Sequence, residues 1–171
     1  MRNEAIFLNG VWEIVLRDIL EIQQYLPEHI MYLQPYKSDR MVLLAENPPT
    51  VDHPVRLLMS LTNDLPNVHY VAEIVGWDDK RMLTGGKLRW LNRLIYSFQW
   101  TEDGVYAHAG DPKKPCVNLL YVRRLKKLAC PFLVDQLINV KDGQPLSTGR
   151  TQAGGWVYVQ NPDDVWLATY L

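Results

Sequence analysis

Residues 54–76 read PVRLLMSLTNDLPNVHYVAEIVG, and this stretch decides the fold class. Two apolar runs, 54–62 and 68–76, are rich in the branched and aromatic residues that favour strands. Only the segment Asn63-Asp64-Leu65-Pro66 separates them, and its composition is typical of a turn. One strand therefore follows the other with no crossover helix between them, which argues against a doubly wound parallel fold.

The residues before this stretch predict a strand that is followed directly by a helix. Residues 4–9 form a short apolar run that we expect to be the opening strand. Over residues 11–26, apolar side chains recur at the spacing of one helix face, Asn9 or Gly10 can cap the start, and Pro27 ends the pattern. A long N-terminal helix is therefore expected over 11–26.

The rest of the chain combines short strands with one broken helical segment. Asp78 or Asp79 can cap a helical turn, Gly85-Gly86 interrupts it, and residues 87–94 continue the helical pattern. We expect further strands at 29–36, 39–45, 117–122 and 155–159, a hairpin at 95–109 and a short helix at 131–138. The 171 residues thus predict a single α+β domain over 1–171 with a strongly bent mixed sheet or a small β-barrel, a long N-terminal helix and a second helical segment.

The composition, 47% hydrophobic and 22% charged residues, is that of an ordinary globular protein and excludes a disordered, collagen-like or coiled-coil chain. No stretch approaches the roughly 18 apolar residues of a membrane span. Residues 1–4 lack the features of a signal peptide, so we expect a cytosolic, cytoplasmic protein. Cys116 and Cys130 are too few for a disulfide framework and are expected to be buried free thiols.

The net charge of −1 conceals a segregation along the chain. Residues 1–79 carry five basic and twelve acidic side chains, a net charge of −7. Residues 80–127 carry eleven basic and three acidic side chains, a net charge of +8. Residues 128–171 carry two basic and four acidic side chains, a net charge of −2. If the basic block lies on one face, it forms the positive patch expected of a surface that binds a polyanion. The alternative is that these charges are dispersed over several faces.

Most catalytic and cofactor motifs are absent. The sequence lacks the glycine-rich nucleotide-binding motifs, the nucleophile elbow and the HExxH zinc motif, and Gly85-Gly86-Lys87 is better interpreted as a turn than as a phosphate loop. The four histidines have no His or Cys at metal-ligand spacing, so no metal is expected. His69 and Glu73 share one face of a predicted strand, where they form either an acid–base pair in a pocket or a surface pair.

The aromatic residues are unusual in kind, because six tryptophans and nine tyrosines accompany only three phenylalanines. Trp and Tyr combine a flat face with a polar tip and suit stacking sites. Trp12 and Trp77 lie close to glycines at the ends of predicted strands, where a ring either lines a pocket or packs in the core. The polar tract 147–155 carries Arg150 and Gln152, which can bond phosphate or base edges unless the tract is an ordinary surface loop.

Two motifs resemble a known superfamily. A strand that leads through Gly10-Val11-Trp12 directly into a helix, together with the stretch YVAEIVG at 70–76, resembles the PUA-like β-barrel superfamily, and within it the EVE, ASCH and YTH-type domains. In YTH-type domains the tryptophan of Gly-Val-Trp is one wall of an aromatic cage around a methylated base. The resemblance therefore implies this role for Trp12, with Tyr36, Trp77 or Trp90 as candidates for a further wall.

The resemblance also implies what the domain binds. It implies binding of DNA or RNA through a flipped, modified base, with no metal or cofactor. Flipping costs a few kcal/mol of unstacking, which stacking on the cage and contacts from Lys and Arg to phosphate offset. EVE-like domains also occur as specificity modules in modification-dependent restriction, so a defence role with a separate nuclease partner is implied as well.

Three hypotheses follow. The leading one is a non-catalytic nucleic-acid reader, whose binding residues are expected to be Trp12, Tyr36, Trp77, Lys80, Arg81, Lys87, Arg89, Arg150 and Gln152. The second is an ASCH-like hydrolase of modified nucleosides or RNA, with Lys80, Glu73 and His69 as its candidate residues. The third is a protein-interaction module that uses the same aromatic surface.

Overall fold

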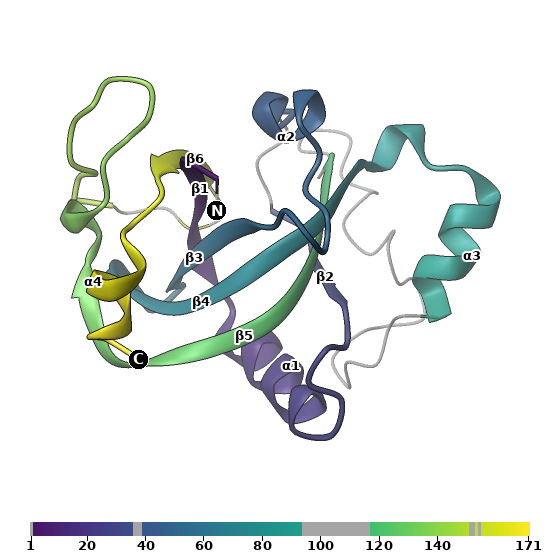
Figure 1. The fold of residues 1–171 in the computed structure, drawn as a ribbon, viewed down its shortest axis with the longest axis horizontal. Coiled ribbons are helices and arrows are strands. Elements are labelled where there is room, and N and C mark those ends of the chain that lie inside the picture. The colour runs from purple at the N-terminus through teal and green to yellow at the C-terminus, as the bar shows by residue number, and fades with distance from the viewer. Residues whose placement is uncertain (1, 36–38, 94–116, 151–152, 154) are drawn as a thin grey trace.

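The computed structural model describes residues 2–35, 39–93, 117–150, 153 and 155–171, and it contains one six-stranded mixed sheet (Figure 1). The strands lie in the order β2-β5-β4-β3-β1-β6, and β1 and β3 are parallel while the other neighbouring pairs are antiparallel. The strands are β1 (Glu4–Val11), β2 (Met31–Leu33), β3 (Val55–Leu61), β4 (Asp64–Asp79), β5 (Asn118–Leu133) and β6 (Gly155–Gln160). The helices are α1 (Glu13–Tyr25), α2 (Val42–Glu46), α3 (Gly85–Arg93) and α4 (Asp164–Ala168), with the 3-10 helices η1 (Lys80–Met82) and η3 (Val134–Gln136).

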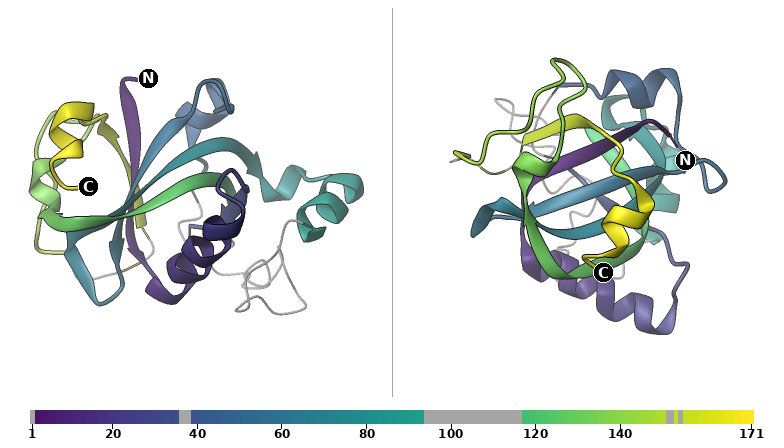
Figure 2. Two further views of the ribbon diagram at one scale, coloured as in Figure 1. Left: turned by 60° about the horizontal axis from the view of Figure 1, so that its bottom comes forward. Right: turned by 60° about the vertical axis from the view of Figure 1, so that its left-hand side comes forward.

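The β3–β4 hairpin confirms the strand pair predicted from residues 54–76. Leu61 pairs with Asp64, so the turn is shorter than expected and β4 begins before residue 68. Strands β4 and β5 are each 16 residues long and strongly curved, as both views of Figure 2 show. Their pairing contains three register shifts, and Arg124, beside one of them, has a φ of 51°. Such bulges bend and twist a strand, which explains the curvature.

Hydrophobic cores cover both faces of the sheet. On one face, Leu16 and Ile19 of α1 are buried in a cluster that includes Leu57 of β3. On the other face, Leu58 is buried in a second cluster with Leu167 of α4. Adjacent residues of β3 thus point into different cores, as the two-residue period of a strand requires.

Two predicted elements are wrong, and tertiary contacts explain both. The stretch 39–45, expected to be extended, contains α2, whose entry is held by the Asn118 side chain: its amide oxygen accepts from Met41 N at 3.1 Å and its amide nitrogen donates to Asp39 O at 2.8 Å. In 131–138, expected to be a short helix, β5 continues to Leu133 because it pairs with Asn67 of β4. Only η3 within that stretch is helical.

Other predictions have mixed outcomes. The helix expected over 11–26 is confirmed as α1, but Gly85-Gly86 begin α3 instead of breaking it. Thr84 Oγ1 accepts from Lys87 N at 3.2 Å and caps this start. Cys130 is exposed, so the expectation of a buried thiol is wrong there. The hairpin expected over 95–109 and Cys116 lie outside the described residues.

The fold class is α+β with a strongly bent mixed sheet, as predicted. Strands β2 and β6 are its two edges, so the described strands do not close into a barrel. In the part of the chain that the structure describes, no helix is long and apolar enough to cross a membrane.

Candidate aromatic binding site

The structure separates the predicted binding residues into two groups. Trp77, Lys80, Arg81, Lys87 and Arg89 lie on the continuous path from the end of β4 through η1 into α3. Trp12 lies between β1 and α1, and Arg150 lies close to β1, with its guanidinium carbon 5.2 Å from the centroid of the Phe7 ring. Tyr36 and Gln152 lie outside the described residues.

Trp12 and Trp77 lie toward opposite ends of the sheet. Trp12 follows Val11, which pairs with Leu61, and Leu61 in turn pairs with Asp64 at the beginning of β4. Trp77 is near the other end of β4, and at about 3.3 Å per residue this corresponds to roughly 40 Å along the strand. The sheet therefore does not bring Trp12 and Trp77 together, and the role of each as a cage wall stays a prediction.

An aromatic pocket lies where β4, β5 and α3 meet. It has a volume of about 250 Å³, and its aromatic and charged lining residues are Trp77 and Asp78 of β4, Tyr121 of β5, and Lys87 and Trp90 of α3. Ile30, Pro48, Pro49 and Val75 complete its apolar wall. Trp77, Lys87 and Trp90 were singled out from the sequence, whereas Tyr121 and Asp78 were missed because only the β4–β5 register brings them together.

Gly76 allows the Tyr121 ring to form part of this pocket. The two residues are register partners, and a Cβ at position 76 would lie 2.6 Å from Cδ2 of Tyr121. Only a residue without a side chain therefore lets the ring lie against the β4 backbone. The ring is buried, and its hydroxyl donates to Oδ2 of Asp78 at 2.6 Å. Burial, followed by this hydrogen bond, raises the pKa of Tyr121 above its ordinary value.

The ammonium group of Lys87 lies at the wall of the pocket, against its aromatic rings. Its Nζ lies 4.4 Å from the centroid of the Trp90 ring, 5.1 Å from that of Tyr121 and 3.5 Å from Oδ2 of Asp78. Trp90 and Tyr121 themselves meet edge to face, with ring centroids 5.8 Å apart. Two aromatic rings and a carboxylate around one ammonium are the groups that recognise cations in aromatic cages.

Trp77 and Lys80 are held by the protein itself. The indole Nε1 of Trp77 donates to Asn118 Oδ1 at 3.1 Å, and the Arg40 guanidinium carbon lies 5.4 Å from its ring centroid. Lys80 is buried and donates from Nζ to Oε1 of Gln34 at 2.5 Å. Lys80 is thus not placed to contact a phosphate backbone in this structure, and the expected contact stays a prediction.

Arg81 and Arg89 are more exposed than Lys80. Arg81 forms an ion pair with Asp79, with Nη2 2.6 Å from Oδ2, and this pair lowers the pKa of Asp79. Arg89 is exposed on α3 and makes no ion pair with the residues that the structure describes. Within the predicted group, Arg89 is therefore the better candidate for a phosphate contact.

The opposite end of the sheet has a different character. Trp12 is 61% exposed, and Gly10, with a φ of +84°, packs so closely under Ala153 that a Cβ at position 10 would lie 2.6 Å from the Ala153 Cβ. Burial lowers the pKa of the Arg150 guanidinium, which lies over the Phe7 ring. Among the described residues, no second aromatic ring faces Trp12.

Ion pairs across the fold offset much of the charge segregation. Arg123 lies 2.9 Å from Glu73 and 3.4 Å from Glu28, whereas Arg124 lies 3.0 Å from Glu28 and 3.4 Å from Glu73. Lys127 lies 3.1 Å from Glu13. Acidic residues of the first block thus neutralise basic residues of the second, and the basic residues of β5 do not form a free positive face.

The candidate residues for hydrolysis are not brought together. Nε2 of His69 lies 2.6 Å from Oδ2 of Asp64, whereas Glu73 pairs with Arg123 and Arg124. The suggested His69–Glu73 pair is therefore wrong. Within the described part of the chain, no group of three His, Cys, Asp or Glu side chains is placed to hold a metal ion.

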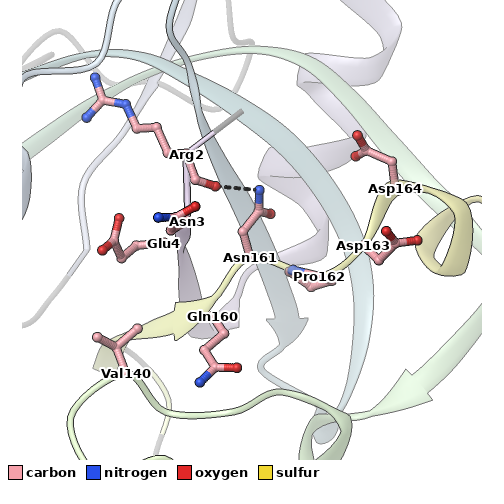
Figure 3. Close-up of a pocket in the computed structure, with 9 residues that line it drawn as sticks. All are labelled: Arg2, Asn3, Glu4, Val140, Gln160, Asn161, Pro162, Asp163 and Asp164. Atoms are coloured by element: carbon pink, nitrogen blue, oxygen red, sulfur yellow. Dashed lines mark hydrogen bonds between the residues drawn. The ribbon is translucent and has the colours of Figure 1, made fainter.

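A larger cavity, about 560 Å³, lies where Asn3 and Glu4 of the N-terminal segment face Gln160 and Asn161 (Figure 3). Asn161 donates from Nδ2 to Arg2 O at 2.8 Å, and the guanidinium of Arg2 instead donates to carbonyls of the 47–53 loop. The cavity is lined mainly by amides and carboxylates and lacks a Ser, Cys or His side chain. It therefore offers no aromatic stacking surface for a base.

No family model, curated protein or solved structure matches the chain. The aromatic pocket is the candidate site because it combines stacking surfaces, a cation and a carboxylate.

Proposed function

We propose that the chain is a non-catalytic nucleic-acid-binding module that holds one unstacked, methylated base in the aromatic pocket. The observation that carries this proposal is the pocket itself, in which Trp77, Trp90 and Tyr121 lie around a volume of about 250 Å³. Aromatic faces of this kind stack on bases irrespective of their sequence.

The surroundings of the pocket support a nucleic-acid ligand. Exposed Arg89 lies on the same helix as Trp90, and Arg81 lies on the preceding turn with its side chain 60% exposed. Cations beside a stacking site are suited to the phosphates that flank a splayed base. The same proposal includes a PUA-like fold and a separate nuclease partner. Both depend on the resemblance of Gly10-Val11-Trp12 and residues 70–76 to the PUA-like superfamily.

The test compares two exposed tryptophans at opposite ends of the sheet. Binding of labelled single- and double-stranded RNA and DNA, plain and methylated, is measured by fluorescence anisotropy at low and physiological salt. We expect salt-sensitive binding that Trp90→Ala weakens by about 1–3 kcal/mol, the contribution of one stacked base. Trp12→Ala is the matched control and should bind like the wild type.

Two outcomes contradict the proposal. Absence of binding to every oligonucleotide at low salt refutes nucleic-acid recognition itself. Binding that is lost in Trp12→Ala and retained in Trp90→Ala refutes the aromatic pocket as the site and favours the Trp12 end of the sheet.

A further inference from the structure

We propose that the aromatic pocket selects a base that carries a positive charge, such as an N1-methylated adenine, and that Lys87 is an internal ligand which this base displaces. The inference rests on the proposed function and names the class of base. Its starting point is the arrangement of Lys87, whose ammonium contacts Trp90, Tyr121 and Asp78 together.

The pocket is built to stabilise one positive charge. The two rings offer their electron-rich faces, and Asp78 supplies a negative charge. The Tyr121 hydroxyl donates to the same oxygen, Oδ2, that faces Lys87, which fixes the carboxylate in position. A neutral base that displaced Lys87 would leave this carboxylate and both rings without a cation, whereas a cationic base would replace the charge.

Lys87 is suited to leave the pocket. Its side chain is 39% exposed and its charge sits on a flexible four-carbon stem. It also lies in the first turn of α3, where the helix dipole disfavours a positive charge. Once displaced, the Lys87 ammonium can contact a phosphate on the same side as Arg89. Its ion pair with Asp78 is then replaced by an ion pair with that phosphate.

A methylated lysine of a protein partner would also satisfy a cation cage. The structure favours a base over such a peptide, because Arg89 lies on α3, which lines the pocket, and Arg81 lies on η1, the turn that joins β4 to α3. These cations attract phosphates and repel the basic segments in which lysines are commonly found. The Trp90 face that Lys87 covers is also flat and suits stacking by a heterocycle.

The experiment uses two isomers that differ in charge. Short single-stranded RNAs of one sequence carry either N1-methyladenine, which is cationic at neutral pH, or N6-methyladenine, which is neutral, and anisotropy gives both affinities for the full chain. We expect the wild type to prefer the N1-methylated strand by at least about tenfold. Asp78→Asn should reduce this ratio to about one, while Asp135→Asn, a charge-matched control on η3, should preserve it.

The outcomes separate this inference from the proposed function. Equal affinities, or a preference for the N6-methylated strand, overturn the inference while leaving a nucleic-acid module in place. Binding to neither strand nor to the unmodified one overturns both. Capture of a trimethyl-lysine peptide without binding of the N1-methylated RNA also overturns it. The wild-type ratio decides the question even if Asp78→Asn does not fold.

Discussion

The hydroxyl of Tyr121 donates to Oδ2 of Asp78 at 2.6 Å, the oxygen that also lies 3.5 Å from the ammonium of Lys87. This carboxylate joins a neutral donor from β5 to a cation from α3, two elements that are distant in the sequence. The aromatic pocket is therefore held together by charge and hydrogen bonding as well as by apolar contact.

Removal of the Tyr121 hydroxyl should destabilise the protein. Tyr121→Phe keeps the ring and deletes the donor to Asp78, so we expect a loss of about 1 kcal/mol in the free energy of unfolding. Urea unfolding measures the change. Tyr25→Phe is the control, because Tyr25 is 81% exposed, and a comparable loss in that variant would show that the effect does not come from the hydrogen bond.

Gly10 should not tolerate a side chain. Its φ of +84° is unfavourable for other residues, and an added Cβ would lie 2.6 Å from Ala153. We expect Gly10→Ala to lower the free energy of unfolding by at least about 1–2 kcal/mol. Gly155→Ala is the control, since a Cβ there meets nothing within 4 Å. Equal unfolding midpoints for the two variants in urea would contradict the close packing described at Gly10.

The buried guanidinium of Arg123 should contribute more than the exposed ammonium of Lys126 on the same strand. Arg123 donates to Glu73, to Glu28 and to the Val51 carbonyl. We expect Arg123→Met to cost about 1.5–3 kcal/mol, because it leaves partly buried acceptors without their charged donor. Lys126→Met should change the free energy of unfolding by less than about 0.5 kcal/mol. A small effect of Arg123→Met in the same urea assay would show that solvent replaces this network.

Alkaline pH should lower the stability of the protein through Tyr158, because burial disfavours the charged phenolate. Burial raises the pKa of Tyr158 to about 12, and its hydroxyl accepts from the amides of Leu43 and Leu44 at 3.1 and 3.4 Å. An unfolded tyrosine has a pKa of about 10. The folded state therefore binds this proton more tightly, and the contribution is complete below about pH 10 and is lost as the pH rises toward 12.

A comparison with Tyr158→Phe isolates that contribution. Urea unfolding of both proteins across this pH range should show the stability difference shifting in favour of the variant as the pH rises. A difference that stays constant between about pH 10 and 12 would contradict the raised pKa.

The salt dependence of RNA binding should identify the phosphate contacts. Arg89 is free of ion pairs with the described residues, whereas Arg124 is held by Glu28 and Glu73. We expect Arg89→Gln to reduce the slope of log affinity against log salt by about one phosphate contact, and Arg124→Gln to leave it unchanged. The reverse pattern would place the nucleic acid along β5 instead of beside α3.

The pattern of apolar residues along the sequence predicted several helices and strands correctly. Helix α1 follows from the spacing of the apolar residues on its buried face. Strands β1 and β3 follow from continuous apolar runs, because a core covers each face of the sheet, and β6 follows from its run of strand-forming residues. Helix α2 did not follow, because hydrogen bonds from the distant Asn118 hold its entry. Helix α4 was also missed, although Asp163 accepts from Val165 N and Trp166 N as a helix cap.

The sequence by itself determined the α+β class, because consecutive strands over 54–76 leave no room for a crossover helix. It also identified Trp77, Lys87 and Trp90 as residues of interest. Only the tertiary structure decided that these three meet Tyr121 and Asp78 in one pocket, and that acidic residues of the first block neutralise much of the basic block. Strand register and long-range ion pairs bring together residues that are far apart in the chain. A local pattern of apolar residues does not indicate which of these residues become neighbours.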